Sequence, residues 1–88
     1  MDWETVSFVF SSRLRLKILL KLSKSKNTPK QLSISLKQPM SHVSKALKQL
    51  NERQLVECLT PSRRKGRLYD ITQSGSKVLD EIGKIGRE

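Results

Sequence analysis

The hydrophobic residues of the chain recur at helical spacing in five stretches and alternate with polar residues in two short ones. Residues 2–10 begin with Asp2, a possible N-cap, and carry five apolar residues. Ser11 and Ser12 then interrupt the pattern and offer a new N-cap for residues 13–22, which are apolar around most of the helix. A helix this apolar is expected at the centre of a small core. One basic strip remains on it, formed by residues four positions apart: Arg13, Lys17 and Lys21.

Residues 28–53 have the pattern of two helices joined by a tight turn. Thr28 can cap the first helix, and Pro29 suits its first position, where the missing N–H costs nothing. Pro39 biases the residue before it away from helical geometry, so it separates the two helices. The second helix has one apolar face at the spacing i, i+3, i+4 and i+7, formed by Val43, Ala46, Leu47 and Leu50. The pattern predicts a helix-turn-helix.

Two short segments that favour strands follow, separated by a basic loop. Residues 55–60 and 68–72 predict the two strands of a hairpin, so that a wing extends over about 55–72. In the loop 61–67, four of the seven residues are basic, and Gly66 can adopt the positive φ of a tight turn.

A last helix is expected over residues 73–86, with Thr72 as its N-cap. Its apolar stripe consists of Val78, Leu79, Ile82 and Ile85. The elements predict a mainly α fold with a small β-hairpin (α+β), in the order helix-helix-helix-helix-strand-strand-helix of a winged helix-turn-helix. A chain of 88 residues is expected to form a single domain with no deep substrate cavity. We expect the terminal helices 2–10 and 73–86 to form a homodimer interface.

The charge of the chain is high and unevenly distributed. Lys and Arg number 18 against 8 Asp and Glu, which gives a formal net charge of +10. No acidic residue occurs between Glu4 and Glu52, whereas ten basic residues lie between them. Such an excess creates a positive field that attracts nucleic acid or anionic lipid. The simpler alternative is a lysine-rich chain that solvates an ordinary surface.

The predicted helix-turn-helix and basic hairpin together suit double-stranded DNA. A helix has the width of the major groove, and polar side chains on its exposed face reach base edges. We therefore interpret the helix over about 40–53 as the recognition helix and the hairpin as a wing that meets phosphate or the minor groove. From the recognition helix and the turn before it, the expected DNA contacts are Gln38, Ser41, His42, Ser44, Lys45 and Lys48. From the wing, they are Arg63, Arg64, Lys65 and Arg67. From the first helix, they are Thr28 and Gln31, although Thr28 equally suits a plain N-cap.

Two sequence motifs flank this arrangement. Residues 12–22 read S-R-L-R-L-K-I-L-L-K-L, and residues 69–75 read Y-D-I-T-Q-S-G. The first resembles the R-L-x-I-L-x-x-L helix of ArsR-type winged-helix repressors, and the second resembles the Y-x-L-T-x-x-G run of the ArsR and MarR families. The apolar positions from Leu32 to Val56 also resemble the helix-turn-helix of these families. The resemblance covers roughly residues 12–79 and implies a repressor that dimerises through its terminal helices.

The chain departs from the family pattern at three positions. Lys37 and Gln54 stand where glycine is common, in the turn and after the recognition helix. Gln38 stands where an apolar residue is common. These departures concern the turn geometry more than the fold.

The sequence offers little material for a metal site, a disulfide or a membrane span. Metal-responsive members of such families use clusters of Cys and His, whereas this chain has only Cys58 and His42. We therefore expect no metal and no cofactor. One Cys cannot form an intrachain disulfide, which favours a reducing compartment. No apolar stretch reaches the ~20 residues of a membrane span, and the first residues lack the basic start of a secretory signal. These features predict a cytoplasmic protein with no membrane partner.

Three alternatives to a sequence-specific regulator remain open. A non-specific architectural protein would use the same cations without reading bases. A winged-helix protein-interaction module of the transcription machinery would leave the basic face unused. An enzyme is the least favoured alternative, because the chain has one His, one Cys and no glycine-rich phosphate loop. The affinity for a selected site relative to random DNA separates a sequence-specific regulator from an architectural protein, and binding to random duplex DNA separates both from a protein-interaction module.

Overall fold

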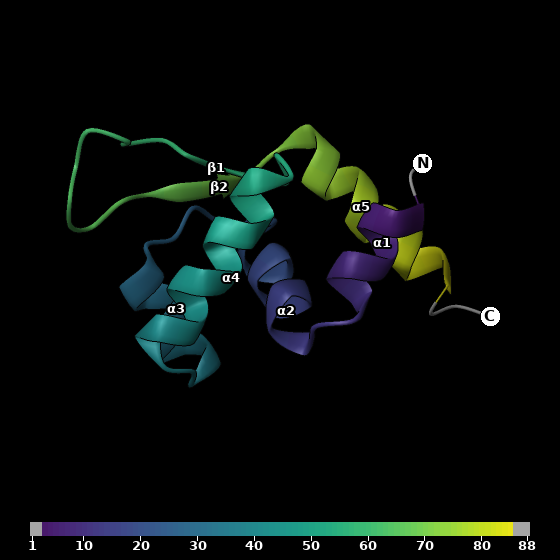
Figure 1. The fold of residues 1–88 in the computed structure, drawn as a ribbon, viewed down its shortest axis with the longest axis horizontal. Helices are drawn as coiled ribbons and strands as arrows, with labels where there is room; N and C mark the ends of the chain where they lie inside the picture. The colour runs from purple at the N-terminus through teal and green to yellow at the C-terminus, as the bar shows by residue number, and fades with distance from the viewer. Residues whose placement is uncertain (1–2, 86–88) are drawn as a thin grey trace.

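Within residues 3–85, which the computed structural model describes, five helices and a two-stranded hairpin make up the fold (Figure 1). In chain order they are α1 (Trp3–Phe10), α2 (Arg13–Leu22), α3 (Pro29–Leu36), α4 (Met40–Glu52), β1 (Val56–Cys58), β2 (Tyr69–Ile71) and α5 (Gln73–Ile85). This order confirms the predicted fold class. Asp2, the expected first cap, and residue 86, the expected end of the last helix, lie outside the described residues.

The core is built around α2. This helix packs against the other four helices and against β2, and its Ile18, Leu19 and Leu22 are buried. The central position expected for the most apolar helix is therefore confirmed. The other buried hydrophobic residues are Val6, Val9, Leu32, Val43, Ala46, Leu47, Leu50, Leu55, Val56, Val78 and Ile82. In the described part of the chain no polar or charged residue is buried, so burial here rests on the hydrophobic effect.

Side chains cap α2 and α3 where the sequence indicated. Ser12 Oγ accepts a hydrogen bond from the Arg15 N–H at 3.3 Å. Thr28 Oγ1 accepts one from the Gln31 N–H at 3.2 Å, and Gln31 Oε1 accepts one from the Thr28 N–H at 2.9 Å. The reciprocal pair is a capping box, which satisfies two backbone donors at the start of α3. Pro39 occupies the N-cap of α4 and supplies no side-chain hydrogen bond there.

The turn after α3 and the end of α4 each pass through a left-handed residue. Lys37 ends α3 at φ 55° and ψ 48°, and Gln54 follows α4 at φ 61°. These are the two positions where the resembled families commonly carry glycine. The backbone geometry is retained here without glycine, at a cost of roughly 1–2 kcal/mol per residue for an L side chain.

The two strands pair antiparallel but are shorter than predicted. The register places Val56 opposite Ile71, Glu57 opposite Asp70 and Cys58 opposite Tyr69. The predicted spans 55–60 and 68–72 are therefore too long at both ends. Towards the loop, the Leu59 N–H still donates to Leu68 O at 2.7 Å, but the Leu68 N–H donates to the side-chain Oγ1 of Thr60 at 2.9 Å. A side chain thus replaces the backbone carbonyl that would continue the ladder.

Asn27 adds a third extended position beside the hairpin. Its N–H donates to Tyr69 O at 3.1 Å, and its carbonyl accepts from the Tyr69 N–H at 2.9 Å. The hydrophobic pattern gives no sign of a strand there. Because Asn27 directly precedes the cap of α3, these two backbone hydrogen bonds connect the start of the helix-turn-helix to the wing.

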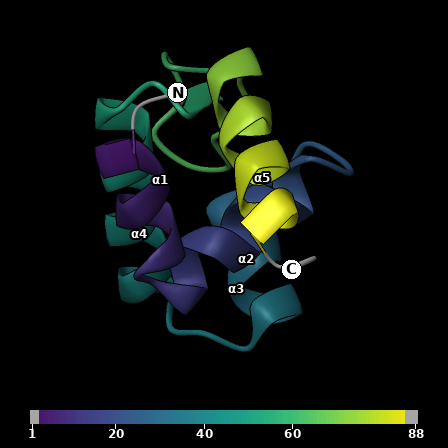
Figure 2. The ribbon, with the colours of Figure 1, turned by 90° about the vertical axis from the view of Figure 1, so that its right-hand side faces the viewer.

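The wing and the terminal helices lie at opposite ends of the molecule. The molecule measures 40 × 24 × 20 Å along its principal axes. In Figure 1 the hairpin loop is at the left end of the long axis, and α1 and α5 are at the right end. Figure 2 looks onto the end that α1 and α5 form, where the two helices pack against each other.

Candidate nucleic-acid interface

α4 has a polar face opposite the apolar face that packs into the core. Its four buried residues are the ones that the sequence pattern indicated. The polar residues of α4 that we expect to contact DNA are all exposed: Ser41, His42, Ser44, Lys45 and Lys48. The face therefore meets the first requirement for a recognition helix, which is that its side chains reach solvent.

Helix geometry distributes these side chains over a broad arc. At about 100° per residue, Ser41, Lys45 and Lys48 lie near the centre of the exposed face. Ser44 and His42 lie on its two flanks, roughly 160° apart. Ser44 is on the flank that faces the wing, because it lines a groove together with wing residues. His42 is on the other flank, so the two side chains approach different parts of any bound groove.

The wing loop presents its cations to solvent. Arg63, Arg64, Lys65 and Arg67 are all exposed. Two features close the loop. The backbone turns at Gly66, which adopts φ 65°, and the Arg67 side chain donates a hydrogen bond through Nε to the Arg63 carbonyl. This contact takes one donor of Arg67 and leaves the terminal guanidinium nitrogens for other acceptors.

A groove of about 610 Å³ lies between α4, the start of α3 and the wing. It is lined by Thr28, Pro29, Lys30, Met40, Ser44, Arg64, Lys65, Gly66, Arg67 and Tyr69. All three groups that the sequence assigned to DNA thus contribute to one concave surface: Ser44 from α4, three cations from the wing, and Thr28 from the start of α3. Arg63 and the residues at the centre of the α4 face lie outside the groove lining.

The residues before α4 are engaged in local hydrogen bonds. Thr28 and Gln31 use their side chains in the capping box of α3. Gln38 is half-buried, and its carbonyl accepts a hydrogen bond from the Ser33 hydroxyl. The capping box stabilises the start of α3 and the Ser33–Gln38 bond stabilises the turn, so any contact of these three predicted residues with a ligand comes in addition to a structural role.

Four residues whose side chains line the groove were not predicted from the sequence as DNA contacts: Pro29, Lys30, Met40 and Tyr69. Lys30 is exposed in the first turn of α3, Met40 is exposed at the start of α4, and Tyr69 is half-buried in β2. Lys30 could have been found, because it lies on the polar side of the predicted first helix. Met40 is apolar and Tyr69 is aromatic, and only the folded arrangement shows that they border a cationic groove.

The cations of the interface have no carboxylate partner among residues 3–85. The ion pairs in that part of the chain join Arg53 Nη2 to Glu4 Oε1 at 2.9 Å and Lys84 Nζ to Glu81 Oε1 at 3.3 Å. Both acidic partners lie on the terminal helices, far from the wing. The positive charge of α4 and of the wing is therefore free to attract an external anion.

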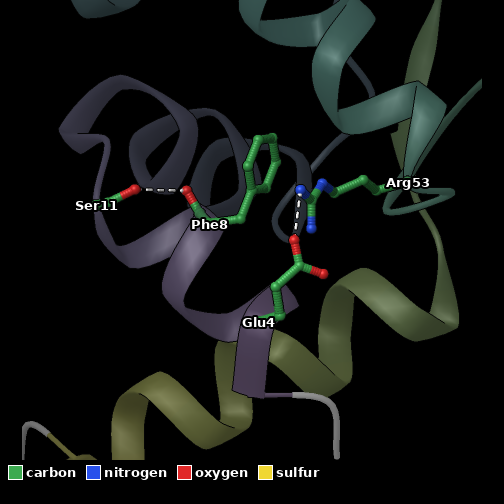
Figure 3. A network of polar contacts seen from close by, with 4 residues as sticks. All are labelled: Glu4, Phe8, Ser11 and Arg53. Carbon is green, nitrogen blue, oxygen red and sulfur yellow. Dashed lines mark hydrogen bonds and ion pairs between the residues drawn. The ribbon is translucent and has the colours of Figure 1, made fainter.

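A cluster of side chains connects the C-terminal end of α4 to α1 (Figure 3). Arg53, the C-cap of α4, pairs with Glu4, and its guanidinium lies 3.9 Å from the centroid of the Phe8 ring. Arg15 lies 3.9 Å from the same ring. Burial, and next the charge of Arg53, lower the pKa of the Arg15 guanidinium. The Ser11 hydroxyl donates to the Phe8 carbonyl at 3.0 Å. These contacts link the C-terminal end of α4 to α1 and α2, at the end opposite the turn.

Residues 3–85 contain no group of three or more His, Cys, Asp and Glu side chains placed to hold a metal ion. In the same part of the chain no helix has the length and apolar character of a membrane span. The expectations that the protein uses no metal and no cofactor stay predictions.

Several solved structures share this fold, two of them described as transcription regulators. BldR from Sulfolobus solfataricus has a TM-score of 0.76 at 25% sequence identity, over 86% of this chain and 55% of BldR. Lactococcus lactis ZitR has a TM-score of 0.72 at 24% identity, over 83% of this chain and 51% of ZitR. A MarR family transcription regulator has a TM-score of 0.64 at 26% identity, over 78% of this chain and 50% of that protein. The chain therefore spans about half the length of these structures.

A family profile covers nearly the whole chain. The profile described as "Methanogenesis regulatory protein FilR1, N-terminal domain" matches residues 3–83. Among curated protein sequences, none matches significantly. The profile and the solved structures confirm the resemblance to winged helix-turn-helix regulators that the sequence motifs indicated.

Proposed function

Because the chain belongs to the FilR1 N-terminal domain family of winged-helix transcription regulators, we propose that it binds double-stranded DNA sequence-specifically and represses transcription. The observation that carries the proposal is the groove in which Ser44 of α4, the start of α3 and the wing cations meet. A convex helix face beside a cationic wing matches a duplex, in which the major groove and the adjacent backbone are read together.

α4 reads bases in this proposal. Lys45 and Lys48 stand at the centre of its exposed face, and lysine pairs with the O6 and N7 acceptors of guanine. Met40 is 47% exposed at the start of α4, which suits an apolar contact with a thymine methyl group. Ser44 and His42 contact opposite sides of the major groove of DNA, because they lie on opposite flanks of α4.

The wing binds phosphate. Arg64, Lys65 and Arg67 line the groove, and Arg63 projects from the same loop. Each phosphate that a cation neutralises releases counterions, so affinity falls with salt. With roughly 6–10 phosphate contacts in the complex, affinity should fall about 10³–10⁵-fold between 50 and 200 mM salt.

A homodimer would place two such interfaces on one duplex. Trp3 and Phe10 of α1 and Ile85 of α5 remain 62%, 55% and 42% exposed at the end opposite the wing. Burial of these side chains between two copies would remove apolar surface from water. Half-sites should then lie about one helical turn apart, ~34–36 Å. Sedimentation of the protein alone and with selected DNA tests this part of the proposal.

Selection of bound duplexes from a random pool, followed by titration of variants, tests the DNA-binding proposal. Arg63→Ala/Arg64→Ala/Lys65→Ala should weaken binding to selected and random DNA alike, and should lower the salt slope by about 0.9 per lost phosphate contact. Lys45→Ala should instead lose about 1–3 kcal/mol of discrimination at particular base pairs. Lys77→Ala, an exposed lysine of α5, is the matched control and should leave both affinities nearly unchanged.

Each alternative has its own signature in this experiment. If the wing variant and Lys45→Ala changed binding in the same way, the assignment of wing and recognition helix would be wrong. A preference for selected over random DNA below about 10-fold would favour a non-specific architectural protein, since specific regulators reach 10³ or more. No binding to any duplex would favour the protein-interaction module. The cytoplasmic location remains a prediction.

A further inference from the structure

A second groove, separate from the candidate DNA interface, lies between α2 and the C-terminal end of α3. Its volume is about 320 Å³. It is lined by Lys17, Leu20, Lys21, Lys24, Ser35, Leu36 and Lys37. None of these residues lines the groove between α4 and the wing. The two grooves occupy opposite ends of α3, which is a helix of eight residues and about 12 Å long.

The groove combines apolar and cationic side chains. Leu20 is 46% exposed, although the other hydrophobic residues of α2 are buried or half-buried. Leu36 is half-buried beside it, and the four lysines of the lining are exposed. An exposed leucine alone needs no explanation. A leucine with a second leucine beside it and four lysines around it is the arrangement of a polar-rimmed docking site.

The cations of this surface also repel one another. Arg13, Lys17 and Lys21 follow each other at i, i+4 spacing on α2, and like charges at that spacing destabilise a helix. No acidic residue between Glu4 and Glu52 offsets them, and the ion pairs within residues 3–85 lie on other elements. An anionic partner that binds here relieves this repulsion, so its carboxylates contribute more than they would beside a neutral helix.

We propose that this groove docks an acidic amphipathic segment of another protein. One large apolar side chain of the segment packs on Leu20 and Leu36, and carboxylates on either side of it contact Lys17, Lys21, Lys24 and Lys37. A protein segment fits better than nucleic acid, because a phosphate backbone carries no apolar group to cover Leu20. Occupation of this groove leaves the α4–wing groove open, so the two surfaces can be used at the same time.

A synthetic peptide with a central leucine between aspartate and glutamate residues tests the proposal. Fluorescence anisotropy measures its affinity for the full chain, and amide chemical shifts of the ¹⁵N-labelled chain locate it. Shifts should concentrate at residues 17–24 and 35–37. Lys17→Gln/Lys21→Gln should weaken binding about fivefold or more, whereas the matched double variant Lys77→Gln/Lys84→Gln on α5 should not. Replacing the peptide leucine by serine should also weaken binding.

Three outcomes would overturn the docking site. Shifts that spread over the wing and α4 would mean that the peptide senses only the net charge. A serine peptide that binds as well as the leucine peptide would remove the role of Leu20 and Leu36. If Lys17→Gln/Lys21→Gln lost as much DNA affinity as the wing variant, the groove between α2 and α3 would be a contact for DNA phosphate instead. Thermal unfolding of each variant separates these outcomes from loss of the fold. Leu20→Ser provides a second variant, which tests the apolar contact because it changes an exposed side chain without changing the charge.

Discussion

Among the glycines of residues 3–85, Gly75, at the start of α5, is the one at which an added side chain meets the closest contacts. A Cβ added to Gly75 would lie 2.2 Å from the Leu55 carbonyl oxygen and 2.7 Å from Ile71 Cγ1. The carbonyl belongs to the backbone at the base of the wing and accepts a hydrogen bond from the Thr72 N–H at 3.1 Å. Accommodating a methyl group therefore requires α5 and the base of the wing to move apart.

The expected destabilisation follows from three contributions. Overpacking of a well-packed site costs about 1–3 kcal/mol, and loss of the hydrogen bond between Thr72 and Leu55 adds about 0.5–1.5 kcal/mol. The better helix propensity of alanine offsets about 1 kcal/mol. We expect Gly75→Ala to lower the free energy of unfolding by about 2 kcal/mol, which corresponds to a fall in Tm of roughly 8–16 °C for a domain of this size.

Gly83 provides a matched control in the same helix. No heavy atom lies within 4 Å of a Cβ built there, and the residue is exposed. Gly83→Ala should therefore gain helix propensity without a clash and raise the free energy of unfolding by roughly 0.5 kcal/mol. Thermal unfolding followed by circular dichroism measures both variants. If Gly75→Ala were as stable as Gly83→Ala, the close approach between α5 and the base of the wing would be refuted.

Further changes probe the turn geometry and the capping box. Lys37→Gly and Gln54→Gly should each stabilise the fold by up to about 1 kcal/mol, because each native residue has a positive φ that glycine adopts freely; a lower midpoint of urea unfolding would contradict this. Thr28→Ala should cost about 1 kcal/mol through loss of the cap, and Thr28→Ser, which keeps the hydroxyl, should recover most of it in the same titration.

Local sequence signals placed most of the helical elements correctly. The serine and threonine before α2 and α3 are caps in the structure, and the apolar spacing of α4 identifies its buried face. These predictions succeeded because capping and periodicity depend on residues within one or two turns of each other. The left-handed backbone at Lys37 and Gln54 was not predicted, although it occurs at the two positions where the resembled families commonly carry glycine.

Contacts between segments that are distant in sequence could not be predicted in the same way. The strands end earlier than their composition suggests, because Thr60 takes over a ladder hydrogen bond with its side chain. Asn27 joins Tyr69 across more than forty intervening positions of chain, and Arg53 meets Glu4 and Phe8 across a similar separation. None of these pairings has a periodic signature, since each depends on how whole elements pack.

The sequence by itself determined that the chain forms a winged helix-turn-helix with a basic wing, because local periodicity, caps and charge are properties of consecutive residues. Only the tertiary structure decided that Ser44 and the wing cations share a groove with Lys30 and Met40, and that Leu20 lies in a second one. A groove is a relation between surfaces of elements that are distant in sequence, and its position is set by the packing of α2 and α3 against their neighbours.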